Sequence, residues 1–133
     1  ISCSNNDDPA PTTNPTSSSV FTATIGTESF STNNTFLATV SAGGTQAFTA
    51  TGTDGKSFSS AIFPSQFPIG EAVNIAYSAS ITYKVGDVTY IPRSGTMTLS
   101  IMENYNRMKG TFTGIFINGT TEISISGEFD IKK

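Results

Sequence analysis

The sequence contains no histidine and no tryptophan, and a single cysteine is found among its 133 residues. Histidine is the commonest general base in enzymes and the commonest metal ligand in proteins, so its absence leaves a catalytic serine without its usual base. One cysteine permits no internal disulfide, and a thiolate zinc site needs more than one such ligand. We therefore predict a protein that holds no metal and uses no cofactor.

Charge is also scarce. Charged side chains make up 13% of the sequence, and ten acids against seven bases give a formal net charge of −3. Two of the acids are Asp7 and Asp8, which leaves the rest of the chain close to neutral. Nucleic-acid binding needs a clustered basic face, and we predict no such partner. No apolar run approaches the roughly 18 residues that span a membrane as a helix.

The remaining reactive groups show no spacing typical of an active site. No serine precedes a lysine by three positions, the spacing of a Ser-x-x-Lys nucleophile. A glycosidase needs two carboxylates that face one cleft, and nothing in the sequence brings two together. We therefore predict that the protein is not an enzyme.

The N-terminal stretch differs from the rest of the chain. It opens with ISCSNNDD and continues with proline, threonine and serine, without hydrophobic periodicity. Such a segment cannot bury enough apolar surface to offset the entropy of ordering it, so Cys3 is not expected in a core. We predict a flexible tether over residues 1–18 and a single β domain over residues 19–133.

The triplet that ends at Cys3 resembles the end of a bacterial lipobox, and the five residues that follow resemble the acidic export signal of surface lipoproteins of Bacteroidota: Ser4, Asn5, Asn6, Asp7 and Asp8. Because the chain starts with Ile1 and not with methionine, we expect a signal peptide to have been removed. The resemblance implies palmitate and other acyl chains on Cys3, which hold the protein in the outer membrane facing the cell exterior. The alternatives are a domain on the periplasmic face and an incidental cysteine in an unstructured tail.

From Val20 onward, apolar residues recur with a period of two, and no stretch of ten residues has the spacing of a helix. Turn-forming glycines separate most of these segments. We predict an all-β fold, an antiparallel meander of about ten strands that forms a β-sandwich or, as the alternative, an up-and-down, lipocalin-like barrel. The expected strands span residues 20–25, 28–32, 36–41, 45–51, 57–63, 74–85, 88–92, 96–102, 107–117 and 120–131.

The last two expected strands form a hairpin around Asn118-Gly119, the favoured pair for a type I′ turn. This turn divides the hairpin into an apolar face and a polar face of serine, threonine and charged residues. On the apolar face Gly110 lies opposite Gly127, which indicates a bend or room for a large side chain, with close approach of a ligand as the alternative. The polar face carries two opposite-charge pairs, Lys109 with Glu128 and Arg107 with Asp130.

A second hairpin is predicted at Gly86-Asp87, after one long strand over residues 74–85. Alternation along that strand puts Tyr77 and Tyr83 on its buried face, and the hairpin puts Tyr83 opposite Tyr90. These tyrosines are then core residues, or they line the cavity of a carrier.

Three longer motifs occur at the two ends of the domain: FTATIGTESF after the tether, SGTMTLSI before the final hairpin, and the closing GTFTGIF…NGTTEISISGEFDI. Together they resemble a family of small Bacteroidota lipoproteins of uncharacterised function, with residues 36–92 poorly matched. The resemblance implies a β-rich fold and supplies no catalytic residue.

Two loops hold aromatic side chains out of phase with the strands. The loop IFPSQFPIGE contains Phe63 and Phe67, and ENYNR contains Tyr105 at a hairpin tip. Such residues either contact a ligand or cover the open end of the fold. We predict a lipid-anchored, non-catalytic binding module for a glycan, a small molecule or a protein. The alternatives are a structural or adhesive envelope component and a carrier of a small apolar ligand.

Overall fold

The computed structural model describes residues 19–39, 44–103 and 106–133. It contains ten strands and one short 3₁₀ helix, and no α-helix lies among the described residues. The predicted all-β class is confirmed. The elements are β2 (Val20–Ile25), β3 (Glu28–Thr32), β4 (Thr35–Thr39), β5 (Gln46–Thr51), β6 (Lys56–Ile62), η3 (Pro64–Gln66), β7 (Ala72–Asn74), β8 (Thr82–Val85), β9 (Val88–Glu103), β10 (Arg107–Asn118) and β11 (Thr121–Lys132).

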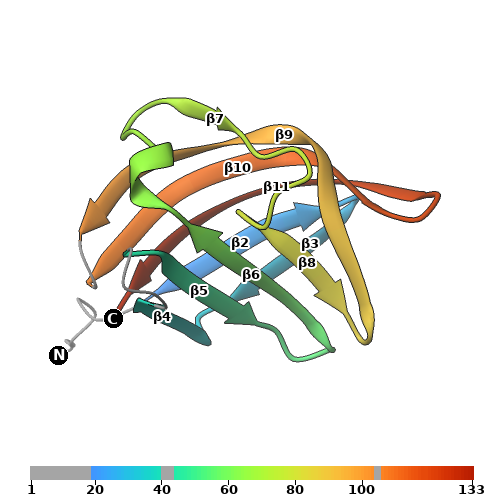
Figure 1. The fold of residues 1–133 in the computed structure, drawn as a ribbon. Coiled ribbons are helices and arrows are strands. Elements are labelled where there is room, and N and C mark those ends of the chain that lie inside the picture. The colour runs from blue at the N-terminus through green and yellow to red at the C-terminus, as the bar shows by residue number, and fades with distance from the viewer. Residues whose placement is uncertain (1–18, 40–43, 104–105) are drawn as a thin grey trace, which may run out of the picture.

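All ten strands belong to one antiparallel sheet with the order β3-β2-β11-β10-β9-β8-β6-β5-β4, and β7 pairs with β9 off this path. Most neighbours in the sheet are also neighbours in the chain, as in the predicted meander. There are two exceptions: the β2–β3 hairpin lies beside the last strand, β11 (Figure 1), and β8 lies beside β6 because β7 pairs elsewhere. The sheet therefore has two edges, β3 and β4, which follow one another in the chain.

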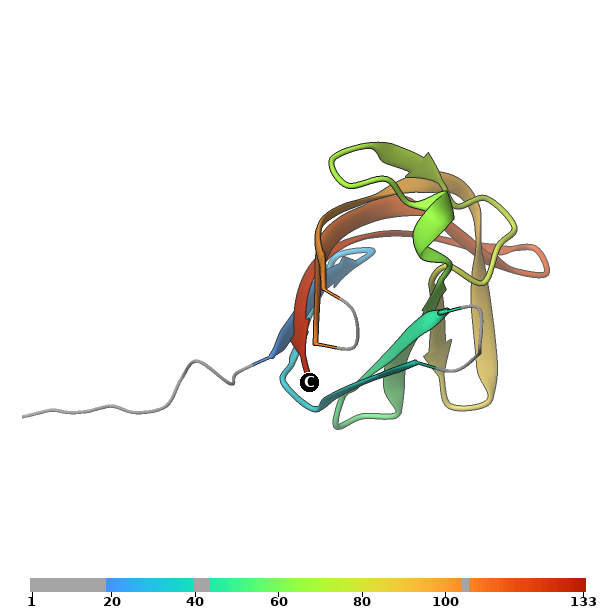
Figure 2. The ribbon, with the colours of Figure 1, turned by 60° about the vertical axis from the view of Figure 1, so that its left-hand side comes forward.

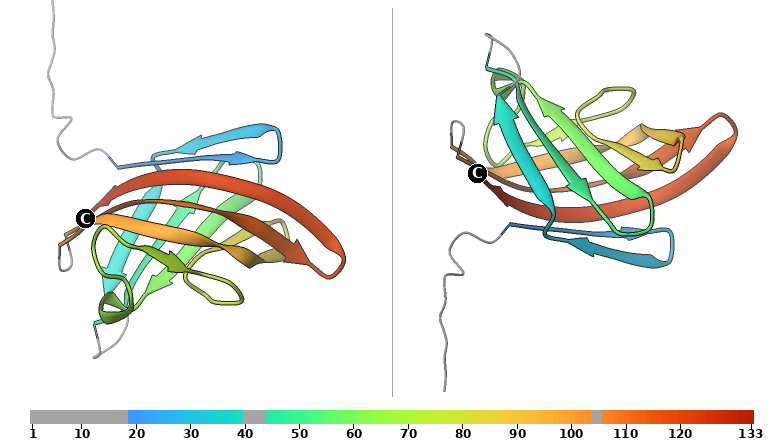
Figure 3. Two further views of the ribbon diagram at one scale, coloured as in Figure 1. Left: turned by 90° about the horizontal axis from the view of Figure 1, so that it is seen from above. Right: turned by 90° about the horizontal axis from the view of Figure 1, so that it is seen from below.

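The long strand β9 joins two facing layers. It pairs with β8 near its start and with β10 and β7 further along. One layer contains β3, β2, β11 and β10, and the other contains β4, β5, β6 and β8 (Figure 2; Figure 3). The sheet curls until it is nearly closed, so it combines the facing layers of a sandwich with the near closure of a barrel.

Phenylalanine rings fill the space between the layers. Phe21 of β2 is fully buried, and its ring centroid lies 4.6 Å from that of Phe58 on β6 and 6.2 Å from that of Phe129 on β11. Aromatic pairs at such distances add to the free energy gained by burial alone. The inward positions of the alternating strands thus meet in one core, which also contains Phe30, Phe48, Phe112, Phe116 and Tyr83.

The edge strand β3 lies against the hairpin between β5 and β6. The ring of Phe30 packs over Gly52, where a Cβ atom would come within 2.6 Å of the ring atom Cε2. Thr32 Oγ1 donates a hydrogen bond to the carbonyl oxygen of Thr51 at 2.7 Å. Side-chain contacts therefore join this edge to the other layer, and no strand ladder pairs β3 with that layer in the described ranges.

The predicted long strand over residues 74–85 is wrong, because the ladder stops after β7 and resumes at β8. Between them, Asn74 Oδ1 accepts a hydrogen bond from the N–H of Ala76 at 2.7 Å. Ser78 Oγ donates one to the carbonyl oxygen of Ile75 at 2.8 Å. Such local side-chain bonds satisfy backbone groups that a strand would offer to a ladder, and the chain turns here instead.

Tyr77 lies in this turning segment with a φ of +55°, a conformation that is rare for a large side chain. Its side chain is 65% exposed, whereas Ile75 and Ile81 on either side are fully buried. The predicted buried face is therefore correct at the two isoleucines and wrong at Tyr77.

The strand β9 is continuous where the sequence predicts two strands, over residues 88–92 and 96–102. The register between β9 and β10 shifts between Ile115 and Phe116, and Arg93 is the extra residue of this bulge. A bulge tolerates the missing N–H of the adjacent Pro92 inside a sheet. The number of strands still agrees with the prediction. One expected strand is divided into β7 and β8, and two expected strands are joined in β9.

The β10–β11 hairpin forms as predicted, but its register differs by two residues. Asn118 pairs with Thr121, and the turn consists of Gly119 and Thr120. Only Gly119 has a positive φ there, whereas a type I′ turn at Asn118-Gly119 needs a positive φ at both residues. Asn118 stays in the strand, and its Nδ2 donates a hydrogen bond to the carbonyl oxygen of Thr89 at 2.8 Å.

A shift of two residues leaves both predicted faces unchanged, because side chains alternate with a period of two. It does separate the two glycines, so that Gly110 lies opposite Phe129 and Gly127 opposite Phe112. A Cβ atom at Gly127 would lie 2.7 Å from Phe112 Cε1. The glycines therefore make room for large side chains, as predicted, but these come from the neighbouring strand and not from the opposite layer.

Candidate functional site

The three aromatic side chains predicted for ligand contact have different surroundings. Phe63 precedes η3 and is 42% exposed, whereas Phe67 follows η3, is 5% exposed and belongs to the core. Phe67 thus covers part of the core, which fits the alternative that these loop residues cover the open end of the fold. Its side chain leaves a ligand little surface to contact. Tyr105 lies outside the described residues.

The three tyrosines proposed to line a carrier cavity do not share one. Tyr83 is buried, with its ring centroid 4.9 Å from that of Phe58 and 5.7 Å from that of Tyr90. This burial raises the pKa of Tyr83. Tyr77 is on the surface, so the expected lining by all three residues is corrected.

The predicted lipid site and export signal fall in residues 1–18, outside the described residues. This applies to Cys3 and to Ser4, Asn5, Asn6, Asp7 and Asp8. Their roles stay predictions from the sequence.

A polar surface lies on the outer side of the layer that contains β3, β2, β11 and β10. The strand registers place its side chains in two rows that cross the strands. We call this surface the hydroxyl face, and Glu128 is its one charged residue. The first row is Ser29, Thr24, Ser126, Thr113 and Thr96, and the second is Ser31, Thr22, Glu128, Thr111 and Thr98.

Alternation along each strand produces these rows. The sequence has Thr-x-Thr at residues 22–24, 96–98 and 111–113, and Ser-x-Ser at residues 29–31. The middle residue of each triplet is a buried apolar one that belongs to the core: Ala23, Met97, Phe112 and Phe30. A strand with an inward apolar residue between two hydroxyls must present both hydroxyls outward.

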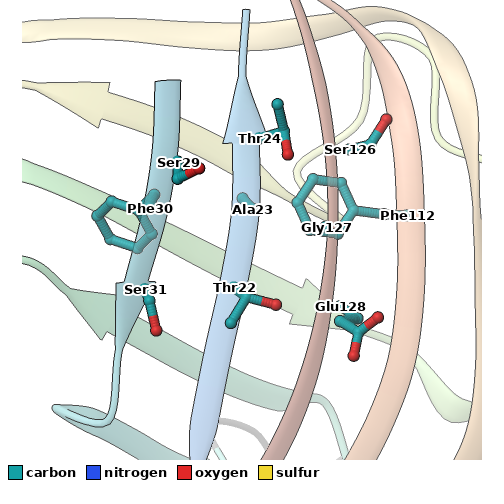
Figure 4. Close-up of a pocket in the computed structure, with 10 residues that line it drawn as sticks. All are labelled: Thr22, Ala23, Thr24, Ser29, Phe30, Ser31, Phe112, Ser126, Gly127 and Glu128. Carbon is teal, nitrogen blue, oxygen red and sulfur yellow. The ribbon is translucent and has the colours of Figure 1, made fainter. Parts of the chain in front are cut away.

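Part of the hydroxyl face is hollowed. A depression of about 450 Å³ lies over β3, β2 and β11 (Figure 4), a volume within the range of ligand sites. Six polar residues and four apolar ones line it. They are Thr22, Thr24, Ser29, Ser31, Ser126 and Glu128, with Ala23, Phe30, Phe112 and Gly127.

A second, smaller depression of about 250 Å³ adjoins the first. Glu128 lines both, so the two depressions meet at this residue, and we call them together the hollowed region, which lies over β3, β2, β11 and β10. Lys109 and Asp130 line the second depression only. The second depression therefore has three charged side chains where the first has one, and the formal net charge of each lining is −1.

The hydroxyl groups of the first depression have unused hydrogen-bonding capacity. Thr113 Oγ1 and Ser126 Oγ lie 2.8 Å apart and share one hydrogen bond. In the part of the chain that the structure describes, the hydroxyls of Thr22, Thr24 and Ser29 bond to no other protein group. Each hydroxyl offers one donor and two acceptor lone pairs, so this surface can both donate to a ligand and accept from it.

The carboxylate of Glu128 has no ion-pair partner among the described residues, so its predicted pair with Lys109 is wrong: Glu128 lies opposite Thr111, and Lys109 lies opposite Asp130. The carboxylate of Asp130 does have an ion-pair partner. Arg107 donates to both oxygens of Asp130, from Nε at 2.9 Å and from Nη2 at 2.8 Å. These hydrogen bonds lower the pKa of Asp130. Glu128 is therefore the free carboxylate at the centre of the hollowed region.

The groups that this surface offers to a ligand are hydrogen-bond donors and acceptors.

Within residues 19–39, 44–103 and 106–133, no three histidine, cysteine, aspartate or glutamate side chains cluster in a way that could hold a metal ion. None of the helices in these ranges is long and apolar enough to cross a membrane.

The sequence contained a signal for this face that was not recognised as a site. Alternation assigned Thr111, Thr113 and Ser126 to an exposed polar face of the last hairpin. The same alternation occurs in β2 and β3, about 100 residues earlier in the chain, and only the pairing of β11 with β2 brings these groups together.

Comparisons of the chain with protein families, with characterised proteins and with solved structures find no match. The resemblance to Bacteroidota lipoproteins is therefore supported by the sequence motifs alone.

Proposed function

We propose that the protein is a lipid-anchored, non-catalytic binding module of the cell envelope. Acyl chains on Cys3 hold it in the outer membrane, and residues 1–18 form a tether that carries the domain away from the lipid, toward the cell exterior. The ISC triplet and the acidic residues Asp7 and Asp8 support this part of the proposal. A module of this kind needs a binding surface on the folded domain.

The observation that supports binding is the hollowed hydroxyl face. Buried phenylalanine rings occupy the space between the layers, so a ligand would bind on the outer surface. There the first depression combines hydroxyls that bond to no other described group with one free carboxylate, Glu128. The second carboxylate near Glu128, that of Asp130 in the adjoining depression, is held by two hydrogen bonds from Arg107, which favours binding over a pair of carboxylates acting in glycoside hydrolysis.

The anchor is tested by metabolic palmitate labelling of the full-length protein in its own host. We expect label on the native protein and none on Cys3→Ser. Because the chain has no other cysteine, an unlabelled native protein would exclude the thioether anchor. Protease treatment of intact cells tests orientation, and full protection of the domain would place it on the periplasmic face.

The binding surface is tested by NMR titration of the isotope-labelled full chain with Cys3→Ser. Three ligand pools are used: neutral oligosaccharides, acidic oligosaccharides and peptides. We expect one pool to shift the amides of β2, β3 and β11, including Thr24 and Ser126. Shifts confined to another region, or none with any pool, would contradict the proposed site.

A structural or adhesive role is the second candidate, and the edge strand β4 favours it. β4 ends the sheet order, and its Phe36 is 66% exposed on the outer side of the strand. An exposed edge strand can pair with a strand of another chain. Sedimentation of native protein and of Phe36→Lys tests this role, which predicts assembly that the lysine abolishes.

A further inference from the structure

We infer that the hydroxyl face binds an uncharged oligosaccharide that lies across the strands, with Glu128 as its central acceptor. This inference rests on the proposed binding function and names the class of ligand. It follows from the donors and acceptors of the face, from its charge and from its shape.

The hydrogen-bonding groups of the face match those of a sugar. Sugar hydroxyls donate and accept, and so do the hydroxyls of Thr22, Thr24 and Ser29. The carboxylate of Glu128 accepts through two oxygens, so it can receive two adjacent sugar hydroxyls in charge-assisted bonds. A partner rich in hydroxyl groups leaves fewer polar atoms of this surface unpaired than an apolar one does.

The charge of the first depression disfavours anionic ligands. The first depression contains one negative side chain and no positive one. Phosphorylated, sulfated or uronic-acid ligands would bring a second negative charge close to Glu128 without a compensating base. In the second depression the positive charge of Lys109 lies opposite the negative charge of Asp130, so the side chains that line the two depressions still carry a net negative charge.

The composition of the face also argues against a protein partner. Protein interfaces are enriched in tyrosine, tryptophan, phenylalanine, methionine and arginine, and they are depleted in serine and glutamate. The only aromatic residues that line the first depression, Phe30 and Phe112, are buried and reach it from beneath the strands.

The shape gives the direction of the ligand. The rows of hydroxyls cross the strands, and successive strands repeat at about 4.8 Å. The two depressions meet at Glu128, so a ligand of more than one ring can run from β3 across β2 and β11 to β10. An oligosaccharide has repeating units, so it can contact hydroxyls on several strands of a row. A single small molecule would contact only one or two of these strands.

The experiment is a titration of the full chain with Cys3→Ser against a panel of neutral and acidic oligosaccharides, read by NMR shifts and by isothermal calorimetry. The test variants in the same background are Glu128→Gln and Thr24→Val, both at exposed positions of the face. The matched controls are Glu71→Gln, at an exposed carboxylate in a loop, and Thr49→Val, at an exposed threonine of the other layer. All variants are compared with the parent by their NMR spectra, so that loss of fold is detected.

We expect neutral oligosaccharides to bind and the affinity to rise from one ring to three. Each test variant should bind about tenfold more weakly than the parent, and each control should bind like the parent. Preference for acidic sugars, equal loss in a control variant, or shifts at β2, β3 and β11 with peptides alone would overturn the glycan inference. Peptide shifts at these strands would still support a binding module, so the two proposals fail separately.

Discussion

The ammonium group of Lys56 lies 2.8 Å from Glu28 Oε1, and this ion pair joins β6 of one layer to the edge strand β3 of the other. Asp54 Oδ2 lies 3.3 Å from the same nitrogen. Hydrogen bonds to Glu28 and then to Asp54 raise the pKa of Lys56. This ion pair lies close to the contact between Phe30 and Gly52. The ion pair and the ring contact therefore both hold β3 against the other layer at the same place.

Removal of the ammonium should loosen this junction. In Lys56→Met we expect the amides of β3 to exchange with solvent faster, by up to about fivefold, because a partly exposed ion pair contributes little. Hydrogen exchange followed by NMR measures the effect. Lys84→Met, at an exposed position of β8, is the matched control and should leave the exchange of β3 unchanged. Equal protection of β3 in both variants would assign the closure to Phe30 alone.

The core should depend on individual phenylalanine rings. Phe58 is fully buried and contacts the rings of Phe21, Phe30, Phe112 and Tyr83. We expect Phe58→Ala to lower the free energy of unfolding by about 3–5 kcal/mol, since it removes apolar contacts and leaves a cavity.

The matched control for this change is Phe36→Ala, because Phe36 is 66% exposed. Its free energy of unfolding should stay within about 0.5 kcal/mol of the parent. Urea unfolding followed by tyrosine fluorescence measures both variants. A small effect at Phe58 would mean that the layers are less tightly packed than the ring distances indicate.

The pair between Arg107 and Asp130 should make stability depend on acid pH. Because Arg107 lowers the pKa of Asp130 in the folded state, the carboxylate stabilises the fold above its unfolded pKa of about 3.9. That contribution is lost as the pH falls through the folded pKa. We expect Asp130→Asn to cost about 1 kcal/mol or less at pH 7 and nothing at the lowest pH.

Urea unfolding from pH 7 downward measures this difference between the two proteins. Asp87→Asn, in the turn between β8 and β9, is the control and should follow the parent at every pH. A difference at Asp130 that persists below its folded pKa would show that the asparagine disturbs packing and not charge.

Gly127 should not tolerate a side chain. An added Cβ atom would lie 2.6 Å from the carbonyl oxygen of Thr22 and 2.7 Å from Phe112 Cε1, too close for either to remain in place. We expect Gly127→Ala to lower the free energy of unfolding by about 1–3 kcal/mol. Chemical unfolding measures the change, with Ser124→Ala at an exposed position of β11 as the neutral control. A neutral result at Gly127 would mean that the Phe112 ring can move aside.

The residues of the turns predicted some of the strand pairings correctly and others not. The Gly86-Asp87 hairpin has the expected pairing of Tyr83 with Tyr90. At the last hairpin, the bond from Asn118 to Thr89 joins the turn to a third strand, and no pairwise argument about the hairpin could include it. The break at residues 75–81 has a similar origin, because side chains of Asn74 and Ser78 replace ladder bonds.

The candidate site was the part least accessible from the sequence. Its hydroxyls belong to single strands that alternation alone assigns to solvent, and no sequence motif marks them as a site, whereas Phe63 and Phe67 lie in one short loop. The hollow depends on β2 lying beside β11, two strands at opposite ends of the domain. Loop aromatic residues are visible in a sequence, whereas a surface made by side-by-side strands is not.

The sequence by itself determined the class of fold and, in the segments that form strands, the side on which most residues lie, because side chains alternate with a period of two and a register shift of two residues leaves the faces unchanged. It also determined the composition, with no histidine, no tryptophan and a single cysteine. Only the tertiary structure decided which strands meet, how β3 closes against β6, and that the rows of serine and threonine form one hollowed face. Those features depend on contacts between distant parts of the chain, such as Glu28 with Lys56 and Thr24 with Ser126, which no local pattern specifies.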